Sequence, residues 1–248
     1  MANYLFFSYI CTRFFSEKNH LYLYIIRYAR EKWVNMVWYL HEKELGLNNK
    51  EQDIFMDKKI KALFFDIDGT LVSFKSHRIP QSTVDALEQA KKNGVEVYIS
   101  TGRPKQIINN LGQIEHLIDG YITANGARCF VEDTLVSQHA ILPSDVKKII
   151  EAADRDNYPA IVVSESRFAI HHYTDEVYEI FCKGLGVDSS VFVTDLNRLG
   201  DEAILQVTPF CTVEQEALLM PTLENCTSGR WHPAFTDITA RGADKGKG

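Results

Sequence analysis

The chain has 248 residues, of which 27 are Lys or Arg and 33 are Asp or Glu, and its net charge of −6 argues against a nucleic-acid-binding surface. Its composition, 45% hydrophobic and 24% charged, is typical of a globular protein. The five cysteines are odd in number and form no C-x-x-C pair, which argues against a disulfide scaffold or a structural zinc site. Such scattered cysteines indicate a reducing compartment, and we expect a cytoplasmic protein.

Residues 1–55 differ from the rest of the chain, since they contain nearly half of its aromatic residues and no proline. Charged residues interrupt the apolar runs, and none of these runs approaches the ~20 residues that span a bilayer. The segment also lacks the features of a convincing signal peptide. We therefore expect no membrane protein, although residues 21–40 also fit an amphipathic helix at a membrane surface. Two interpretations remain open: residues 1–55 are an N-terminal extension, or they are not native and the protein begins at Met56.

From Lys61 onward, the hydrophobic pattern predicts the alternating strands and helices of an α/β fold. Strands are expected over 62–65, 95–100 and 121–124, and helices over 82–92 and 104–111. Gly94 ends the first of these helices, and Asn125-Gly126 predicts a turn after the third strand. Two parallel strands joined by a helix form a βαβ unit, which is expected to be right-handed.

Residues 143–225 show a different pattern, which predicts an α+β module. Helices are expected over 144–156, with Ser144 as the cap, over 174–184 and over 213–223, and strands over 160–164, 168–172 and 203–207. Because neighbouring residues of a strand face opposite sides, we do not expect His171 and His172 to share a metal ion. Further strands are expected over 226–231 and 235–239, and the second of these would return the chain to the first sheet.

Two carboxylates follow the first strand, in the segment 64–71 that reads F-F-D-I-D-G-T-L. Asp66 and Asp68 point the same way from an extended chain, and Gly69 permits the turn that must follow. Open α/β sheets bind ligands at the carboxyl ends of their strands. A calcium loop is excluded, because the positions that need Gly and Glu hold Leu71 and His77. A plain acidic junction between a strand and a turn remains the alternative.

This segment resembles the first motif of the haloacid dehalogenase superfamily, most members of which are phosphatases. The resemblance implies that Asp66 is the nucleophile and that Asp68 is the general acid and base. An Asp at the second position favours phosphatases and phosphomutases over the other activities of the superfamily. The resemblance also implies that Mg²⁺ is bound by the Asp66 carboxylate and the backbone carbonyl of Asp68.

The end of the second strand, residues 97–104, reads V-Y-I-S-T-G-R-P. A hydroxyl and a glycine there can bind a phosphate at the positive end of a helix, although an ordinary strand–helix turn has the same pattern. The segment resembles the second motif of the superfamily in its Cof-like branch, which implies that Thr101 and Gly102 bind the phosphate. Arg103 would contact the substrate or a cap, or would be a solvated charge. Asn125 lies in a similarly Cof-like pattern and either reaches the site or only forms a turn.

The segment Gly242–Gly248 reads G-A-D-K-G-K-G and resembles the third motif, whose lysine neutralises the nucleophile and the phosphate. The preceding strand and the K-G pair favour Lys245 over Lys247, and a frayed basic tail is the alternative. Thr101 follows Asp66 by 35 residues, whereas Lys245 follows Thr101 by 144, far more than a core needs. An insertion at this place is the Cof-like arrangement, in which an α+β cap closes over the site.

The family's fourth, acidic motif helps to bind Mg²⁺ and would follow Lys245, but the sequence does not contain it; Asp119 and Asp237 are the acids that could replace it. We therefore expect an α/β fold with a Rossmann-like parallel-sheet core, incomplete at the C-terminus, and an inserted α+β cap. The expected division is an extension over 1–55, the first part of the core over 56–142, the cap over 143–225 and the rest of the core over 226–248.

The expected activity is the Mg²⁺-dependent hydrolysis of small phosphorylated metabolites, such as sugar phosphates, through an aspartyl-phosphate intermediate. One alternative is a phosphomutase, against which the place of the insertion counts. The other is a non-catalytic remnant that binds phosphorylated ligands. Neither the physiological substrate nor the oligomeric state can be predicted from the sequence.

Overall fold

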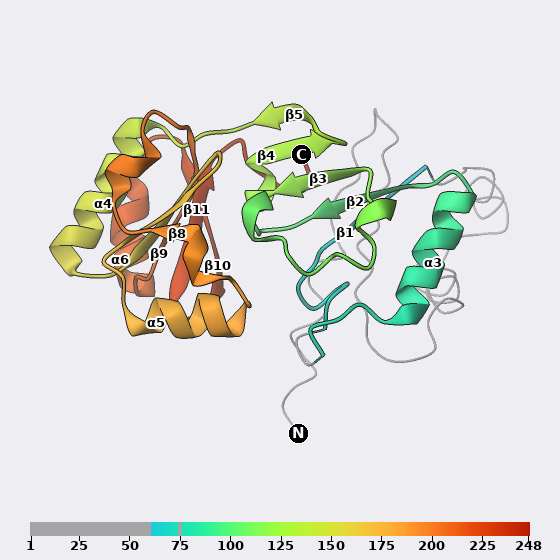
Figure 1. Cartoon of the computed structure of the whole chain (residues 1–248). Helices are drawn as coiled ribbons and strands as arrows, with labels where there is room; N and C mark the ends of the chain where they lie inside the picture. The colour runs from blue at the N-terminus through green and yellow to red at the C-terminus, as the bar shows by residue number, and fades with distance from the viewer. Residues whose placement is uncertain (1–60, 74–75) are drawn as a thin grey trace, which may run out of the picture.

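The computed structural model describes residues 61–73 and 76–248. The N-terminal extension, the helix considered over 21–40 and the alternative start at Met56 lie outside the described residues. In the described part, two sheets with their own helices lie side by side (Figure 1). The chain passes from the first to the second after the hairpin β4–β5, and its C-terminal end lies back beside β3 and β4.

The first sheet has five strands in the order β1-β2-β3-β4-β5, and its first three strands are parallel. These strands are β1 (Ala62–Phe65), β2 (Glu96–Ser100), β3 (Gly120–Thr123), β4 (Arg128–Val131) and β5 (Thr134–Gln138). The antiparallel hairpin of β4 and β5 has no counterpart among the expected strands. Much of β5 is exposed, so its residues do not show the alternation of a half-buried strand.

Helix α3 (Gln81–Lys92) connects β1 to β2 and packs on the first sheet. Its buried residues Val84 and Leu87 share a core with Val97 and Ile99 of β2. Because β1 and β2 are parallel neighbours, their carboxyl ends meet at one edge of the sheet. The two segments that carry the first and second motifs therefore lie together.

The second sheet has six strands in the order β10-β11-β9-β6-β7-β8 and is antiparallel except between β7 and β8. Its strands are β6 (Ala160–Ser164), β7 (Phe168–His171), β8 (Phe192–Val193), β9 (Ile204–Pro209), β10 (Cys226–His232) and β11 (Phe235–Ala240). Its helices are α4 (Pro143–Asp156), α5 (Asp175–Val177), which continues as a π-helix over Tyr178–Gly184, and α6 (Val213–Leu219). A parallel-stranded core beside a separate α+β unit confirms the expected fold class.

The expected return of residues 235–239 to the first sheet is wrong. β11 lies inside the second sheet, between β10 and β9. A short connection through Pro233 and Ala234 keeps β11 antiparallel to β10, and all six of its residues are buried, as in a central strand. We therefore propose that the cap extends from 143 to 240, so that only residues 241–248 return to the first sheet.

The expected helix over 104–111 is reduced to a 3₁₀ turn over Lys105–Ile107. Nη1 of Arg103 donates to the carbonyl of Ile107 at 3.2 Å. A continuing helix would use that carbonyl to accept from the N–H of Leu111. The arginine side chain thus competes with the helix for its acceptor, and the chain continues as a loop.

Two local expectations about the second unit, one for helix α4 and one for strand β7, are also wrong. Helix α4 begins at Pro143, after Leu142, so Ser144 is not its cap; the fixed φ of proline suits the first helical position. Strand β7 ends at His171, and His172 has a φ of +54°, in the left-handed region. The alternation of a strand therefore stops between the two histidines.

The described cysteines, which are Cys129, Cys182, Cys211 and Cys226, are all free. None of the described helices has both the length and the apolar character that crossing a bilayer requires.

Candidate active site

Asp66 and Asp68 lie on a turn at the carboxyl end of β1, and the residue between them fixes this turn. Ile67 has no exposed surface and packs into the core of the first sheet. Its carbonyl accepts from the backbone N–H groups of Thr70 and Val72 at 3.2 and 2.9 Å. With Ile67 pointing inward, the two flanking carboxylates face the edge of the sheet, where both stay partly exposed.

Lys245 lies at Asp66, although 179 positions separate them in the chain: its Nζ donates to Oδ1 at 2.9 Å. Gly126 allows the C-terminal segment to approach. Its φ is +93°, and a Cβ at this position would lie 2.4 Å from the carbonyl oxygen of Asp244. Among the described residues Lys247 forms no ion pair. The structure thus brings Lys245, and not Lys247, to the first carboxylate.

Thr101 and Gly102 follow β2 at the same edge. Thr101 is buried, and its Oγ1 accepts from the backbone N–H of Arg103 at 3.1 Å. The backbone N–H of Gly102 donates to no residue in the described ranges, so it remains available to an anion. A Cβ on Gly102 would lie 3.0 Å from Oδ1 of Asn125. The N–H of Asn125 donates to the carbonyl of Thr101 at 3.1 Å, which ties the turn after β3 to the end of β2.

Arg103 forms a bidentate ion pair with Asp68. Its Nε and Nη2 donate to the two carboxylate oxygens at 2.7 and 2.8 Å, and the arginine is only 7% exposed. Such paired bonds fix the two side chains relative to each other. Nη2 also reaches the carbonyl of Leu185 in the second unit at 3.4 Å. Arg103 is therefore a buried link between the two units at the second carboxylate, and not a solvated charge.

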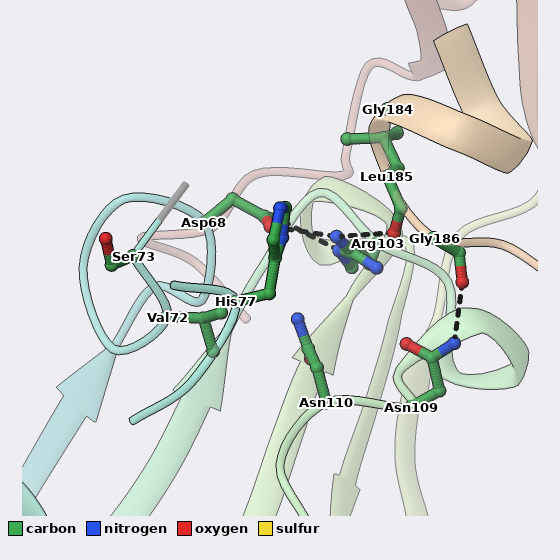
Figure 2. Close-up of a pocket in the computed structure, with 10 residues that line it drawn as sticks. All are labelled: Asp68, Val72, Ser73, His77, Arg103, Asn109, Asn110, Gly184, Leu185 and Gly186. Carbon is green, nitrogen blue, oxygen red and sulfur yellow. Dashed lines mark hydrogen bonds and ion pairs between the residues drawn. The ribbon is translucent and has the colours of Figure 1, made fainter. Parts of the chain in front are cut away.

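A cavity of about 220 Å³ opens beside this ion pair, between the loops that follow β1 and β2 and the end of the π-helix (Figure 2). Its polar lining includes Asp68, His77, Arg103, Asn109 and Asn110. Nδ2 of Asn109 donates to the carbonyl of Gly186 at 3.0 Å and so connects the two sides. Asp66 does not line the cavity, which begins at the second carboxylate. The two asparagines could not be predicted from the sequence, because polar residues in a loop follow no characteristic spacing.

Asp119, one of the two acids considered for completing a metal site, lies at the wrong edge of the sheet. Its carboxylate accepts from Nζ of Lys91 at 2.6 Å and from the backbone N–H of Val97 at 2.7 Å. Val97 is near the start of β2, whereas the two carboxylates lie beyond the opposite ends of the strands. This acid therefore cannot reach them.

Asp237, the other acid considered, is buried in β11 and has its oxygens engaged. The indole Nε1 of Trp231 and the hydroxyl of Thr208 donate to it at 2.9 and 2.7 Å, and Nδ2 of Asn125 donates at 3.4 Å. Burial raises the pKa of Asp237 above its ordinary value of 3.8, although these hydrogen bonds act in the opposite direction. The carboxyl group therefore connects the turn at Asn125 to the second sheet.

The oxygen atoms at the end of β1 are of the type that a hard cation prefers as ligands. Oδ2 of Asp66 and the backbone carbonyl of Asp68 accept no hydrogen bond from the residues that the structure describes. Mg²⁺ prefers carboxylate and carbonyl oxygens and keeps several water ligands. The carboxylate of Asp68, in contrast, is engaged with Arg103.

Residues 63–248 match the family of haloacid dehalogenase-like hydrolases, which agrees with this arrangement of motifs at the end of a parallel sheet. The chain therefore belongs to the haloacid dehalogenase-like hydrolase family. The resemblance inferred from its first three motifs, including the Cof-like branch, is confirmed.

Solved structures of this superfamily share the fold. A sugar phosphatase of subclass IIB is 45% identical, with a TM-score of 0.70 over 76% of this chain and 73% of that chain. A phosphatase from Bacteroides thetaiotaomicron is 27% identical, with a TM-score of 0.66 over 82% of this chain and 73% of that chain.

Curated relatives match over shorter segments. The 5-amino-6-(5-phospho-D-ribitylamino)uracil phosphatase of Bacillus subtilis is 29% identical over 126 residues, which are 49% of this chain and 46% of the relative. The HMP-PP phosphatase of Yersinia enterocolitica is 35% identical over 88 residues, or 35% of this chain and 31% of the relative. The chain thus spans less than half the length of the curated relatives it matches.

Proposed function

We propose that this protein is a phosphatase that hydrolyses small phosphorylated metabolites through a covalent intermediate on Asp66. The observation that carries the proposal is a pair of carboxylates on one turn, each with its own cation: Lys245 on Asp66 and Arg103 on Asp68. Two carboxylates in different environments are suited to two different roles. The phosphatases among the relatives support this assignment.

In the first step, a carboxylate oxygen of Asp66 attacks phosphorus, and the bond from phosphorus to the leaving oxygen breaks. The phosphoryl group is then bound to Asp66 as an aspartyl-phosphate. Lys245 offsets the repulsion between the two anions that must approach each other. The hydroxyl of Thr101 and the free N–H of Gly102 bind phosphoryl oxygens, since positioning and electrostatics dominate phosphoryl transfer.

Asp68 moves the protons. It donates one to the leaving oxygen, and then accepts one from the water that attacks the aspartyl-phosphate, which releases inorganic phosphate and restores Asp66. The bidentate pair with Arg103 engages both carboxylate oxygens of Asp68, so this pair must open before Asp68 can contact the leaving oxygen. A phosphate or hydroxyl group of the substrate that competes for Arg103 provides that opening.

We propose Mg²⁺ as the cofactor, held by the Asp66 carboxylate and the backbone carbonyl of Asp68. When bound, it would neutralise negative charge on the phosphate. The oxygen atoms of this chain support the assignment, because Oδ2 of Asp66 and the carbonyl of Asp68 accept no hydrogen bond from the described residues.

The leaving group would occupy the cavity beside Asp68. At about 220 Å³ the cavity is smaller than the ~300–1,000 Å³ of typical ligand sites. Its imidazole, guanidinium and amide groups suit hydroxyls, and one of the similar solved structures is a sugar phosphatase. We therefore favour a sugar phosphate as the substrate and, given the free cysteines, a cytoplasmic location.

The test is phosphate release from a panel of sugar phosphates, measured with Mg²⁺ and with a chelator. Replacing the nucleophile in Asp66→Asn should lower turnover roughly 10³-fold or more. Asp68→Asn should lower it nearly as much, yet allow the phosphoenzyme to accumulate, which mass spectrometry detects. Asp85→Asn, on the exposed surface of α3, is the matched control and should retain the wild-type rate.

Other outcomes separate the alternatives. An isomerised sugar phosphate without released phosphate would indicate a phosphomutase, and binding without turnover would indicate a non-catalytic remnant. If Asp66→Asn keeps more than a tenth of the wild-type rate, the covalent mechanism is wrong.

A further inference from the structure

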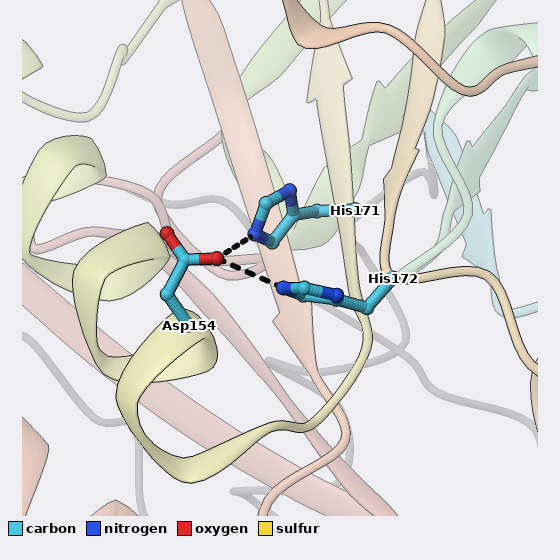
Figure 3. A group of neighbouring side chains, drawn as sticks. All are labelled: Asp154, His171 and His172. Carbon is cyan, nitrogen blue, oxygen red and sulfur yellow. Dashed lines mark hydrogen bonds and ion pairs between the residues drawn. The ribbon is translucent and has the colours of Figure 1, made fainter.

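A second group of potential ligands lies in the cap, on elements that do not carry the catalytic residues. It consists of Asp154 on α4, His171 at the end of β7, and His172 (Figure 3). Nε2 of each imidazole lies at the same carboxylate oxygen, Oδ1 of Asp154, at 2.6 and 2.8 Å. The three potential ligand atoms all lie within 4.8 Å of one another. The side chains therefore converge on one point.

The backbone explains this convergence. In a continuous strand, His171 and His172 would face opposite sides and could not share a metal ion. The left-handed conformation of His172 turns its ring back, and the ring centroids lie 4.1 Å apart. The elements themselves are well packed, since Ala153 of α4 and Ile170 of β7 are buried next to the ligands. Ligands on packed elements are held close to their binding geometry.

We propose that Asp154, His171 and His172 bind a divalent transition-metal ion, with Zn²⁺ as the preferred ion. Two imidazole nitrogens and one carboxylate oxygen form a donor set that suits Zn²⁺, Ni²⁺ or Cu²⁺, whereas Mg²⁺ prefers oxygen ligands. This site is thus chemically distinct from the proposed Mg²⁺ site at Asp66.

Small side-chain movements would let the site accept the ion. Bonds of ~2.0–2.1 Å in a tetrahedral site place ligand atoms about 3.3 Å apart, so the carboxylate oxygen moves roughly 0.5–0.7 Å away from the ring nitrogens. The two ring nitrogens, which lie no more than 4.8 Å apart, must take up the same spacing. Each imidazole must then offer its Nε2 lone pair and carry its proton on Nδ1. Neither Nδ1 has a partner among the described residues, so both can carry that proton toward solvent. The partly exposed side chains leave a fourth position for water.

A bound ion would connect the last turn of α4 to the end of β7. Because the ion binds the folded cap in preference to the unfolded chain, it stabilises the cap in proportion to its affinity and concentration. The site therefore links the stability of the cap to the supply of Zn²⁺.

The experiment titrates Zn²⁺ into the chelator-treated full chain, with binding followed by calorimetry and the unfolding midpoint followed by thermal denaturation. The wild type should bind one more equivalent of Zn²⁺ than the variant His171→Ala/His172→Ala and should gain thermal stability that this variant does not gain. Mg²⁺ should give no such difference. The exposed His116 of the first unit provides the control His116→Ala, which should bind like the wild type, as should Asp66→Asn.

A conservative variant excludes a merely structural effect. His172→Gln can still donate a hydrogen bond to Asp154 but lacks the ring nitrogen, so it should keep the fold by circular dichroism and lose at least tenfold in Zn²⁺ affinity. The proposal is overturned if the wild type shows no Zn²⁺ binding beyond that of the double variant, or if His172→Gln binds Zn²⁺ within twofold of the wild type.

Discussion

Asp66 and Asp68 share one turn, yet each faces a different cation. Lys245 is a compact charge on a flexible stem, and its three donors can rotate from a carboxylate to a phosphate. Arg103 presents a fixed fork and is buried, so it holds Asp68 in one orientation. The flexible cation thus stands at the proposed nucleophile, and the rigid cation stands at the proposed proton donor.

The first prediction compares the two lysines of the C-terminal segment. Lys245→Ala removes the cation 2.9 Å from Asp66 and should lower kcat/KM about 10²-fold, because the approaching anions lose their neutralising charge. Lys247→Ala is the matched control and should change kcat/KM less than threefold. Steady-state phosphate release measures both. Equal losses in the two variants would mean that general positive charge, and not this contact, supports catalysis.

The sequence allowed some of these residue-level features to be predicted, but not others. The two Asp residues were predictable because strand alternation and a turn glycine are local signals. The K-G pair favoured Lys245, and the structure indeed brings this lysine to Asp66. The partner of Arg103 could not be predicted, because Asp68 lies 35 positions away and their contact depends on how two loops fold.

The second prediction concerns the buried carboxyl group of Asp237. Burial raises its folded pKa above the ordinary 3.8, so the unfolded chain releases this proton more readily than the folded one. The stability of the wild type relative to Asp237→Asn should therefore fall as the pH rises from about 3.8 through the folded pKa, and then level off. Urea unfolding of both proteins at a series of pH values checks this sign. A difference that grows with pH would contradict the raised pKa.

At the scale of elements, the turn between β3 and β4 positions the third motif. Gly126→Ala would place a methyl group 2.4 Å from the carbonyl oxygen of Asp244, in a backbone conformation that strains any L side chain. We predict a loss of stability of about 1–3 kcal/mol together with a large loss of kcat, because Lys245 is displaced. Denaturant unfolding and phosphate release measure the two effects.

Gly94→Ala is the control for backbone strain alone. Gly94 also has a positive φ, of +76°, but a Cβ there meets nothing within 4 Å. This variant should lose about 1 kcal/mol of stability and keep its kcat. If both variants lose activity equally, the close contact with Asp244 does not position Lys245.

Helices and strands that depend on neighbouring residues could be predicted from the sequence, whereas features that depend on distant contacts could not. The strands β1, β2 and β6 were predictable from β-branched and apolar runs. The helix over 104–111 was not, because Arg103 takes its carbonyl acceptor. The place of β11 was also missed, since sheet order is set by pairing between distant strands and has no local pattern.

At the scale of the whole molecule, polar contacts join the two units. Glu165 of the second unit accepts through its backbone carbonyl from Arg128 at 2.7 Å, and its carboxylate accepts from Gln138 at 2.6 Å. Asn109 donates to Gly186 at the cavity. Apolar contacts join the units as well, since Ile107 of the first unit packs among buried residues of the second such as Ile161.

The last prediction tests the contact at the cavity. Asn109→Ala should lower kcat/KM several-fold, because the second unit loses a hydrogen bond that closes the cavity, while global stability changes by less than ~0.5 kcal/mol. Asn197→Ala, whose side chain bonds only within its own exposed loop, should leave both quantities unchanged. Steady-state kinetics and urea unfolding give the comparison. An unchanged kcat/KM in Asn109→Ala would show that this contact does not contribute to closure.

The segment that carries Lys245 continues directly from β11, and the N–H of Ala243 donates to the carbonyl of Ala240 at 2.8 Å. Residues 241–248 therefore run from β11 of the second sheet to the turn at Gly126 in the first, and they bring Lys245 to Asp66. A hinge motion between the units would act on this connection and lengthen the contact between Lys245 and Asp66. Where such a motion limits turnover, we expect kcat to fall as solvent viscosity rises.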